Sequence, residues 1–246
     1  MNEPPPTVGD PSPARPLLVV DVDEVVLRFV GPLERRLAAS GHRFTPASFA
    51  ITGNVYRVGS NQPIGADEVR RLIDAFYDSD GAGQPPVEGA AAALRRLAAS
   101  CEPWLLSNLP ARHAEARRAR LAALGIDLPL LVNEGPKGPA VAALAGPDPE
   151  ARGVIFVDDG PVHLASVRDR VPAVRLVQFV DDERFFAMAP EVPGVWLKTR
   201  SWAEVVARIE ALPQVAARLA GDAAGAGRTT PADGGDEPPD PPMFPV

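Results

Sequence analysis

Pro16-Leu17-Leu18-Val19-Val20-Asp21-Val22-Asp23-Glu24-Val25-Val26 is the stretch that decides the fold. A continuous apolar run that stops at acidic residues is typical of a strand buried on both faces and followed by a polar loop. Similar apolar runs follow at 102–108, 128–133, 153–159 and 174–180. Patterns typical of helices separate them, at 88–100, 111–125 and 138–146. This alternation predicts an α/β fold with a doubly wound parallel sheet covered by helices on both sides.

The segment 30–84 breaks this rhythm. It contains two helical patterns, at 32–41 and 65–79, and at most one weak strand at 48–53. We therefore expect a small, mostly helical insertion after the first strand, in a core made of 16–29 and 85–220. The Pro-rich residues 1–15 and the acidic, Pro- and Gly-rich residues 221–246 have little to bury, which predicts disordered tails.

Composition excludes several classes of protein. Cys101 is the single cysteine among 246 residues, so an internal disulfide is impossible. No apolar run approaches the roughly 18 to 20 residues of a membrane-spanning helix, and the N-terminus has no signal-like stretch, which predicts a cytoplasmic protein without a membrane partner. The formal net charge of −7 offers no basic excess for a nucleic-acid polymer.

Polar side chains follow the predicted strands, and the carboxyl ends of parallel strands meet at one edge of a sheet, where ligands bind. Converging carboxylates repel one another unless a cation lies among them, and Mg²⁺ prefers oxygen ligands. A hydroxyl, an amide and an ammonium group at the same edge suit the oxygens of a phosphate. We therefore expect Mg²⁺ and a small phosphorylated substrate. The residues concerned are Asp21, Asp23, Ser107, Asn108, Lys137, Asp158 and Asp159.

The order of these residues resembles the haloacid dehalogenase superfamily of phosphatases and phosphotransferases. The matching motifs are DVDEVV at 21–26, Ser107 after an apolar strand, Lys137, and the pair Asp158-Asp159 after the run VIFV. The resemblance covers roughly residues 16 to 200. It implies a Rossmann-like core, and it identifies 30–84 with the helical cap that usually selects the substrate in this family.

The resemblance also implies a role for each residue. Asp21 would be the nucleophile that forms an aspartyl-phosphate, and Asp23 would protonate the leaving oxygen and later accept a proton from water. Ser107 and Lys137 would hold the phosphoryl oxygens, assisted by Asn108. The metal would be held by Asp21, by Asp23 through its main-chain carbonyl, and by Asp159, with Asp158 orienting the site.

Two positions depart from the family pattern. Glu24 stands where many members have glycine, and no acidic residue follows the Asp158-Asp159 pair at the usual close spacing. His163 in that region has no metal-ligand spacing, so we expect a surface or capping residue. The arginines at 112, 117, 118 and 120 are most simply explained as a solvated helix face.

These residues predict a Mg²⁺-dependent phosphatase of small metabolites. One alternative is a nucleotidase-like phosphatase in which Tyr56, Phe76 or Tyr77 stacks on a base. Another is a protein of the same fold that binds a phosphorylated ligand or a partner without turnover. Arg57, Arg70 and Arg71 of the insertion are weaker candidates for contact with an anionic substrate. The sequence does not predict an oligomeric state.

Overall fold

The computed structural model describes residues 15–79, 81–171 and 173–226. Their core is a six-stranded parallel sheet with the order β5-β4-β1-β6-β7-β8. Numbered along the chain within this sheet, the order is 3-2-1-4-5-6, which is that of a doubly wound fold. The predicted fold class is therefore confirmed. The strands are β1 (Leu17–Val20), β4 (Glu102–Ser107), β5 (Leu130–Val132), β6 (Val154–Asp158), β7 (Arg175–Phe179) and β8 (Val195–Thr199).

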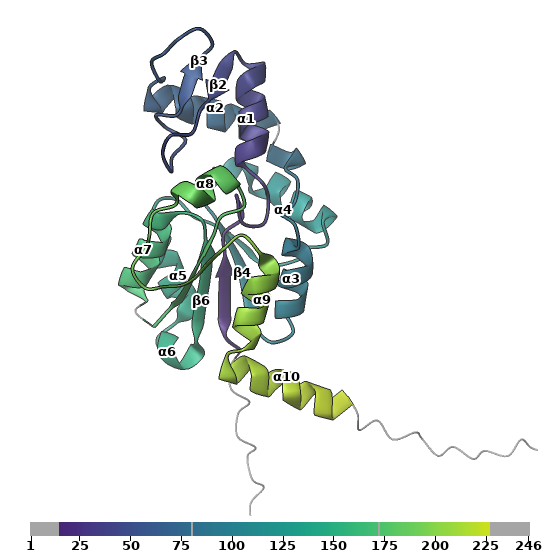
Figure 1. Ribbon diagram of the computed structural model, residues 1–246. Coiled ribbons are helices and arrows are strands. Elements are labelled where there is room, and N and C mark those ends of the chain that lie inside the picture. Colours follow the sequence, from purple (N-terminus) through teal and green to yellow (C-terminus); the bar gives the residue numbers. More distant parts are fainter. Residues whose placement is uncertain (1–14, 80, 172, 227–246) are drawn as a thin grey trace, which may run out of the picture.

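Helices cover both faces of the sheet (Figure 1). Leu18 and Val20 of β1 pack in one apolar cluster with residues of α3 (Ala90–Leu97) and α9 (Trp202–Glu210). Leu17 and Val19 point to the other face and pack with residues of α5 (Gly138–Ala145) and α7 (Pro161–Arg170). All four side chains of β1 are fully buried, which explains the continuous apolar run in the sequence.

The remaining core helices connect or flank these layers. Trp202 at the start of α9 donates its indole N–H to the Val25 carbonyl at 3.0 Å, which ties this helix to the loop after β1. The core also contains η2 (Ala111–His113), α4 (Ala114–Ala123), α6 (Pro149–Arg152), α8 (Glu183–Met188) and α10 (Pro213–Ala226).

The insertion after β1 lies beyond the carboxyl ends of the strands (Figure 1). It comprises α1 (Val30–Ala39), an antiparallel pair β2 (His42–Phe44) and β3 (Val55–Arg57), α2 (Ala66–Ser79) and η1 (Gly81–Gly83). The two predicted helices are present. The expected weak strand at 48–53 is wrong: these residues form the loop that joins two strands which the sequence pattern did not indicate.

Two features of the C-terminal part differ from expectation: an additional strand and a longer helix. β8 adds a sixth strand at the edge of the sheet, where its partly buried residues lack a continuous apolar run. α10 continues to Ala226, past the expected start of the C-terminal tail at 221. The rest of both predicted tails, 1–14 and 227–246, lies outside the described residues.

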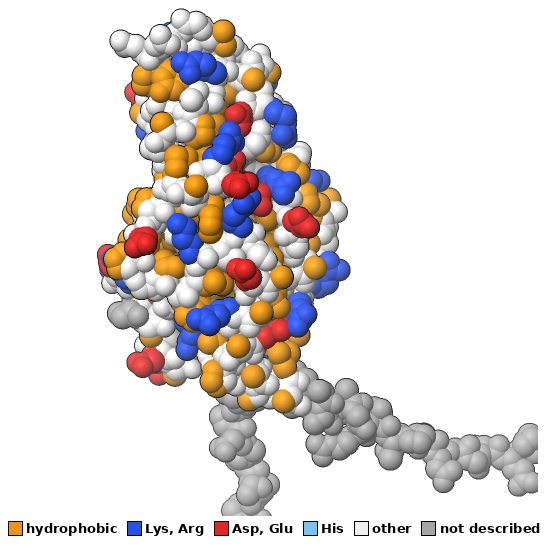
Figure 2. Space-filling view, in the orientation of Figure 1, with side chains coloured by type: hydrophobic (Ala, Val, Ile, Leu, Met, Phe, Trp, Pro, Cys, Tyr) orange, Lys and Arg blue, Asp and Glu red, His pale blue; other side chains and the backbone are white. Residues whose placement is uncertain are grey.

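The surface carries both signs of charge. In the view of Figure 2, acidic and basic side chains are interspersed with apolar ones over the core and the insertion. None of the helices in the described part of the chain is long and apolar enough to cross a membrane.

Candidate active site

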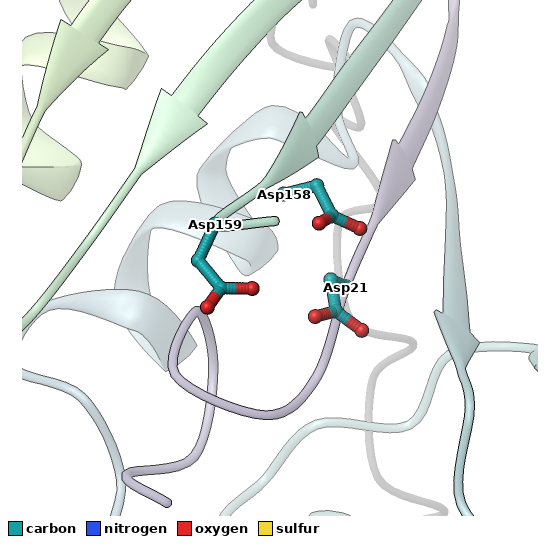
Figure 3. Close-up of side chains that lie close together, drawn as sticks. All are labelled: Asp21, Asp158 and Asp159. Carbon is teal, nitrogen blue, oxygen red and sulfur yellow. The ribbon is translucent and has the colours of Figure 1, made fainter. Parts of the chain in front are cut away.

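The register of the sheet brings two acidic residues together. β1 lies between β4 and β6, with Val20 opposite Val157, and the Asp21 amide continues this ladder by donating to the Val157 carbonyl at 2.9 Å. The next residues along, Asp21 and Asp158, are therefore neighbours. Together with Asp159 they place carboxylate oxygens within 4.8 Å of one another. Figure 3 shows how the three side chains gather at the ends of the strands.

Lys137 completes this cluster from a separate part of the chain. Its Nζ lies 2.5 Å from Asp21 Oδ1 and 2.7 Å from Asp158 Oδ2, and the side chain is only 1% exposed. Although burial lowers the pKa of Lys137, the carboxylates of Asp158 and Asp21 raise it above its ordinary value. Lys137 is therefore a buried lysine between two carboxylates that favour its charged form.

Close helix packing fixes the position of Lys137 at the start of α5. The next residue is Gly138, whose amide donates to Ser166 Oγ of α7 at 3.0 Å. A Cβ at position 138 would lie 2.3 Å from the Ser166 carbonyl oxygen, so only glycine allows this approach. The contact between α5 and α7 thus determines where the lysine side chain enters the site.

One ammonium group does not balance the three carboxylates. Burial, followed by repulsion from Asp158 and Asp23, raises the pKa of Asp21 to about 7 against the opposing effect of Lys137. Burial, then Asp158 and Asp21, raises the pKa of Asp159 well above its ordinary value. Such a cluster of oxygen donors fits a hard divalent cation, because the cation would relieve the repulsion that these shifts express.

Asp23 lies beside this cluster in a dense hydrogen-bond network. Oδ1 accepts from Gln84 Nε2 at 2.9 Å and from Arg117 Nη1 at 3.0 Å. Oδ2 accepts from Tyr77 Oη at 3.2 Å, from Arg117 Nη2 at 3.4 Å and from Ser107 Oγ at 3.5 Å. Both oxygens of Asp23 thus have several donors, which come from the insertion, from β4 and from α4.

Arg117 overturns an expectation from the sequence. Its side chain is 2% exposed, so it is not part of a solvated helix face. It pairs with Asp23, donates to Gln84 Oε1 at 2.9 Å, and has its guanidinium 5.8 Å from the centre of the Tyr77 ring. A buried guanidinium requires such partners because its desolvation is costly.

Ser107 and Asn108 lie at the end of β4 but face different surroundings. Ser107 is fully buried, and its hydroxyl donates to Asp23 rather than facing the cavity described below. Asn108 lines that cavity, with Nδ2 donating to the Gly135 carbonyl at 2.7 Å and Oδ1 accepting from Asn133 at 2.8 Å. The assignment of both residues to phosphate binding stays a prediction.

Asp158 is held from two sides. It is fully buried, with Oδ2 on Lys137 and Oδ1 accepting from the Gly160 amide at 2.7 Å. It does not line the cavity, whereas Asp159 does. This placement is compatible with the orienting role expected for Asp158.

Glu24 has an unusual backbone and a structural contact. Its φ of 66° is the left-handed region, which explains why glycine suits this position in proteins with a similar motif. Oε2 accepts from the amides of Phe29 and Val30 at 2.8 and 2.9 Å, at the start of α1. Burial raises the pKa of Glu24 to about 7 against these two hydrogen bonds. Glu24 therefore links the acidic edge to the insertion.

A cavity of about 230 Å³ opens over the acidic cluster, between the core and the insertion. Its polar side is formed by Asp21, Asp23, Glu24, Asn108, Lys137, Asp159 and His163. Its apolar side is formed by Phe29, Val30, Phe49, Ala50, Ile51, Tyr77 and Phe185.

The position of His163 in this cavity was not predicted. It follows Gly160 by three residues on α7, and its Nδ1 is buried with no hydrogen-bond partner in the described structure. Burial lowers the pKa of His163. The sequence contains one signal for a place at the site. The short spacing from the acidic pair puts residue 163 in the first turn of α7, next to the strand end.

Comparisons with known proteins bear on the fold. No family model and no curated protein matches the chain. Solved structures do match. A haloacid dehalogenase-like protein from Agrobacterium tumefaciens is 17% identical with a TM-score of 0.54, covering 81% of this chain and 99% of that one. A haloacid dehalogenase family hydrolase from Deinococcus radiodurans, with bound phosphate and sodium, is 17% identical with a TM-score of 0.55, covering 81% and 96%.

A third structure agrees with these. It is a haloacid dehalogenase-like family hydrolase from Streptococcus pneumoniae, 11% identical with a TM-score of 0.55, covering 79% of this chain and 98% of that one. The chain therefore has the haloacid dehalogenase-like fold, and the resemblance noted in the sequence is confirmed at the level of the fold.

Proposed function

We propose that the protein is a Mg²⁺-dependent phosphatase that hydrolyses a small phosphorylated metabolite through an aspartyl-phosphate on Asp21. The observation that carries this proposal is the meeting of Asp21, Lys137 and Asp159 at one cavity although they come from three separate parts of the chain. The hydrolases of similar fold support the reaction class, and the bound phosphate in one of them supports a phosphoryl substrate.

Each of the two steps forms one bond to phosphorus and breaks another. A carboxylate oxygen of Asp21 attacks phosphorus, the bond from phosphorus to the leaving oxygen breaks, and that oxygen takes a proton from Asp23. Water then attacks phosphorus and gives a proton to Asp23 while the bond between phosphorus and Asp21 breaks. Inorganic phosphate leaves, and both carboxyl groups return to their initial state.

The other residues of the site support these steps. The Lys137 ammonium favours the ionised, nucleophilic form of Asp21 and balances charge on the phosphoryl oxygens. Asp158 holds Lys137 from the opposite side. Asp21, Asp159 and the main-chain carbonyl of Asp23 would hold Mg²⁺, which when bound supplies positive charge to the phosphoryl group.

The nucleotidase alternative depends on an aromatic ring in the cavity. Phe76 is fully buried, and Tyr56 lies under the Arg43 guanidinium at 4.2 Å without lining the cavity. Tyr77 does line it. Of the three rings considered from the sequence, Tyr77 is thus the one in a position to contact a substrate.

A direct assay tests the proposal. With p-nitrophenyl phosphate and Mg²⁺ we expect hydrolysis that EDTA abolishes and added Mg²⁺ restores. Asp21→Asn removes the nucleophile and should lower kcat at least about 10³-fold. Asp169→Asn is a matched control, because Asp169 is exposed and pairs with Arg168 on the far part of α7. Robust turnover by Asp21→Asn would show that the nucleophile is misassigned, and no turnover by the wild type would favour a binding protein.

A further inference from the structure

Apart from the polar residues, the lining of the cavity is an apolar and aromatic wall. Phe29 and Tyr77 stack with ring centres 5.9 Å apart, and Phe49 meets Phe185 edge to face at 5.4 Å. Each of these four rings lines the cavity, together with Ile51. The rings belong to the insertion and its entry, except Phe185, which belongs to α8 of the core. Four aromatic rings therefore border the space left for a leaving group.

Among the residues that the structure describes, this apolar wall has no charged side chain. Among the described residues that line the cavity, Lys137 is the only lysine or arginine, and both Asp21 and Asp158 already neutralise it. Arg57, Arg70 and Arg71 of the insertion do not compensate, because none of them lines the cavity. Arg57 pairs with Glu68, and Arg70 pairs with Asp67. A leaving group with its own carboxylate or second phosphate would meet no cation here.

From these two features we infer that the site is specific for phosphate monoesters whose leaving group is small, uncharged and apolar, with an aromatic ring as the best fit. The inference rests on the proposed phosphatase function. The cavity volume of about 230 Å³ is below the ~300–1,000 Å³ of most ligand pockets and also has to hold the phosphate, so the cavity can enclose about one ring of the leaving group. Offset and edge-to-face contacts with the wall favour that ring.

The loop that carries Phe49 and Ile51 is held in place by its own side chains. Asn54 is 2% exposed, and its Oδ1 accepts from the Ala47 amide at 3.0 Å. Its Nδ2 donates to the carbonyls of Ser48 at 3.0 Å and Ala50 at 2.6 Å. The apolar wall is therefore formed before a substrate binds, which lowers the entropic cost of binding.

The test compares substrates whose leaving groups are chemically alike. Benzyl phosphate and glycerol phosphate are both esters of primary alcohols, so their intrinsic reactivities are similar, while phosphoglycolate adds a carboxylate. The readout is kcat/KM from released phosphate with Mg²⁺ present. Burial of one ring predicts a preference of about 10- to 100-fold for benzyl phosphate over glycerol phosphate. Phosphoglycolate should be the poorest of the three.

Variants of the wall test the cause of the preference. Phe49→Ala should lower the ratio of benzyl to glycerol phosphate at least about fivefold, and because both substrates are measured on one protein, losses from misfolding cancel in the ratio. Ile51→Arg should raise kcat/KM for phosphoglycolate relative to benzyl phosphate by supplying the missing cation. Val58→Ala is the control, since Val58 is 70% exposed in the same insertion and does not line the cavity.

The outcomes separate the two proposals. Hydrolysis of glycerol phosphate or phosphoglycolate as fast as benzyl phosphate would overturn the inference and leave the phosphatase function standing. An unchanged substrate ratio in both Phe49→Ala and Ile51→Arg would overturn it as well. No release of phosphate from any ester would overturn the phosphatase function, and the inference with it.

Discussion

The hydrogen bonds that Asp23 accepts oppose its proposed role in proton transfer. As the proposed proton-transfer residue it must take up and release a proton, yet its oxygens accept hydrogen bonds from Arg117, Gln84 and Tyr77. Arg117 in turn depends on Asp23 as its anionic partner, because the guanidinium is almost fully buried. We therefore expect Arg117 to act as a positioning residue, which holds Asp23 in place without lining the cavity itself.

Arg117→Met tests this role. A displaced Asp23 protonates the leaving oxygen poorly, so kcat for benzyl phosphate should fall about 10²-fold or more. For p-nitrophenyl phosphate, whose leaving group departs without a proton, the loss should stay below about tenfold. Arg117→Lys should restore part of the difference. Arg118→Met is the control, since Arg118 is exposed and pairs with Glu115.

Equal losses on both substrates would contradict a positioning role for Arg117 and indicate general damage to the fold. The comparison of leaving groups is essential, because a purely structural role would lower both rates together. The ratio of the two kcat values is therefore the quantity to report.

Single residues also show what the sequence can and cannot predict. Asp21, Lys137 and Asp159 could be placed at one site because strand ends converge in a doubly wound sheet. Arg117 could not, since it is one of several arginines on the same helix. One signal was present: Arg117 precedes the buried Leu121 by four residues, which places both on the inner face of α4. The arginines of this helix were interpreted from their charge as solvent-exposed, although the spacing to Leu121 indicates that Arg117 faces inward.

The contact between helices α5 and α7 fixes the position of Lys137 relative to the acidic cluster. Gly138→Ala would place a methyl group 2.3 Å from the Ser166 carbonyl oxygen, and backbone on both sides must move to relieve the clash. We expect a loss of about 1 to 3 kcal/mol in the free energy of unfolding from this overpacking. The displacement of Lys137 should lower kcat for p-nitrophenyl phosphate at least about tenfold.

Urea unfolding and steady-state kinetics measure the two effects of Gly138→Ala. Gly65→Ala serves as the control, because a Cβ added at position 65 would meet no atom within 4 Å and the φ of Gly65 is not positive. If Gly138→Ala kept wild-type kcat, the close approach of the two helices would not be what positions Lys137.

The elements that the sequence did not predict share a physical cause. β2 and β3 span three residues each, which is too short for an alternating apolar pattern to be recognised. β8 is an edge strand whose residues are mostly only partly buried, so it lacks a continuous apolar run. α10 extends past 220 because alanine is the best helix former, and its pattern outweighs the Gly and Asp within it. Buried central strands were predictable because burial on both faces leaves a continuous apolar run.

Without a bound cation, the carboxylates at the edge of the sheet lower the stability of the whole folded protein. Burial and neighbouring carboxylates raise the pKa of Asp159 above that of the unfolded chain. The unfolded state therefore releases this proton at lower pH than the folded state, so metal-free stability decreases as pH rises above about 3.9, the ordinary Asp value, until Asp159 in the folded state has ionised. A cation that binds only the folded protein offsets this loss.

Thermal unfolding measures the effect. At neutral pH, Mg²⁺ at 100 times its dissociation constant should stabilise the folded state by about 2.7 kcal/mol, which raises Tm by roughly 5 to 10 °C in a chain of this size. Asp159→Asn should behave in the opposite way: in EDTA its Tm should exceed that of the wild type, because one repelling charge is gone, and Mg²⁺ should shift it little. This advantage should decrease as pH falls and disappear below about pH 3.9, where the carboxyl of the unfolded chain is also mostly protonated.

Asp169→Asn distinguishes a site effect from a general effect of removing one negative charge, since Asp169 lies on α7 in an exposed pair with Arg168. Its Tm should respond to Mg²⁺ as the wild type does. An equal Mg²⁺ shift in Asp159→Asn would mean that the cation binds elsewhere, whereas a lower Tm of Asp159→Asn in EDTA would mean that the carboxylate stabilises the fold. The two variants together therefore test whether the carboxylate repulsion that destabilises the metal-free site also favours the binding of Mg²⁺ there.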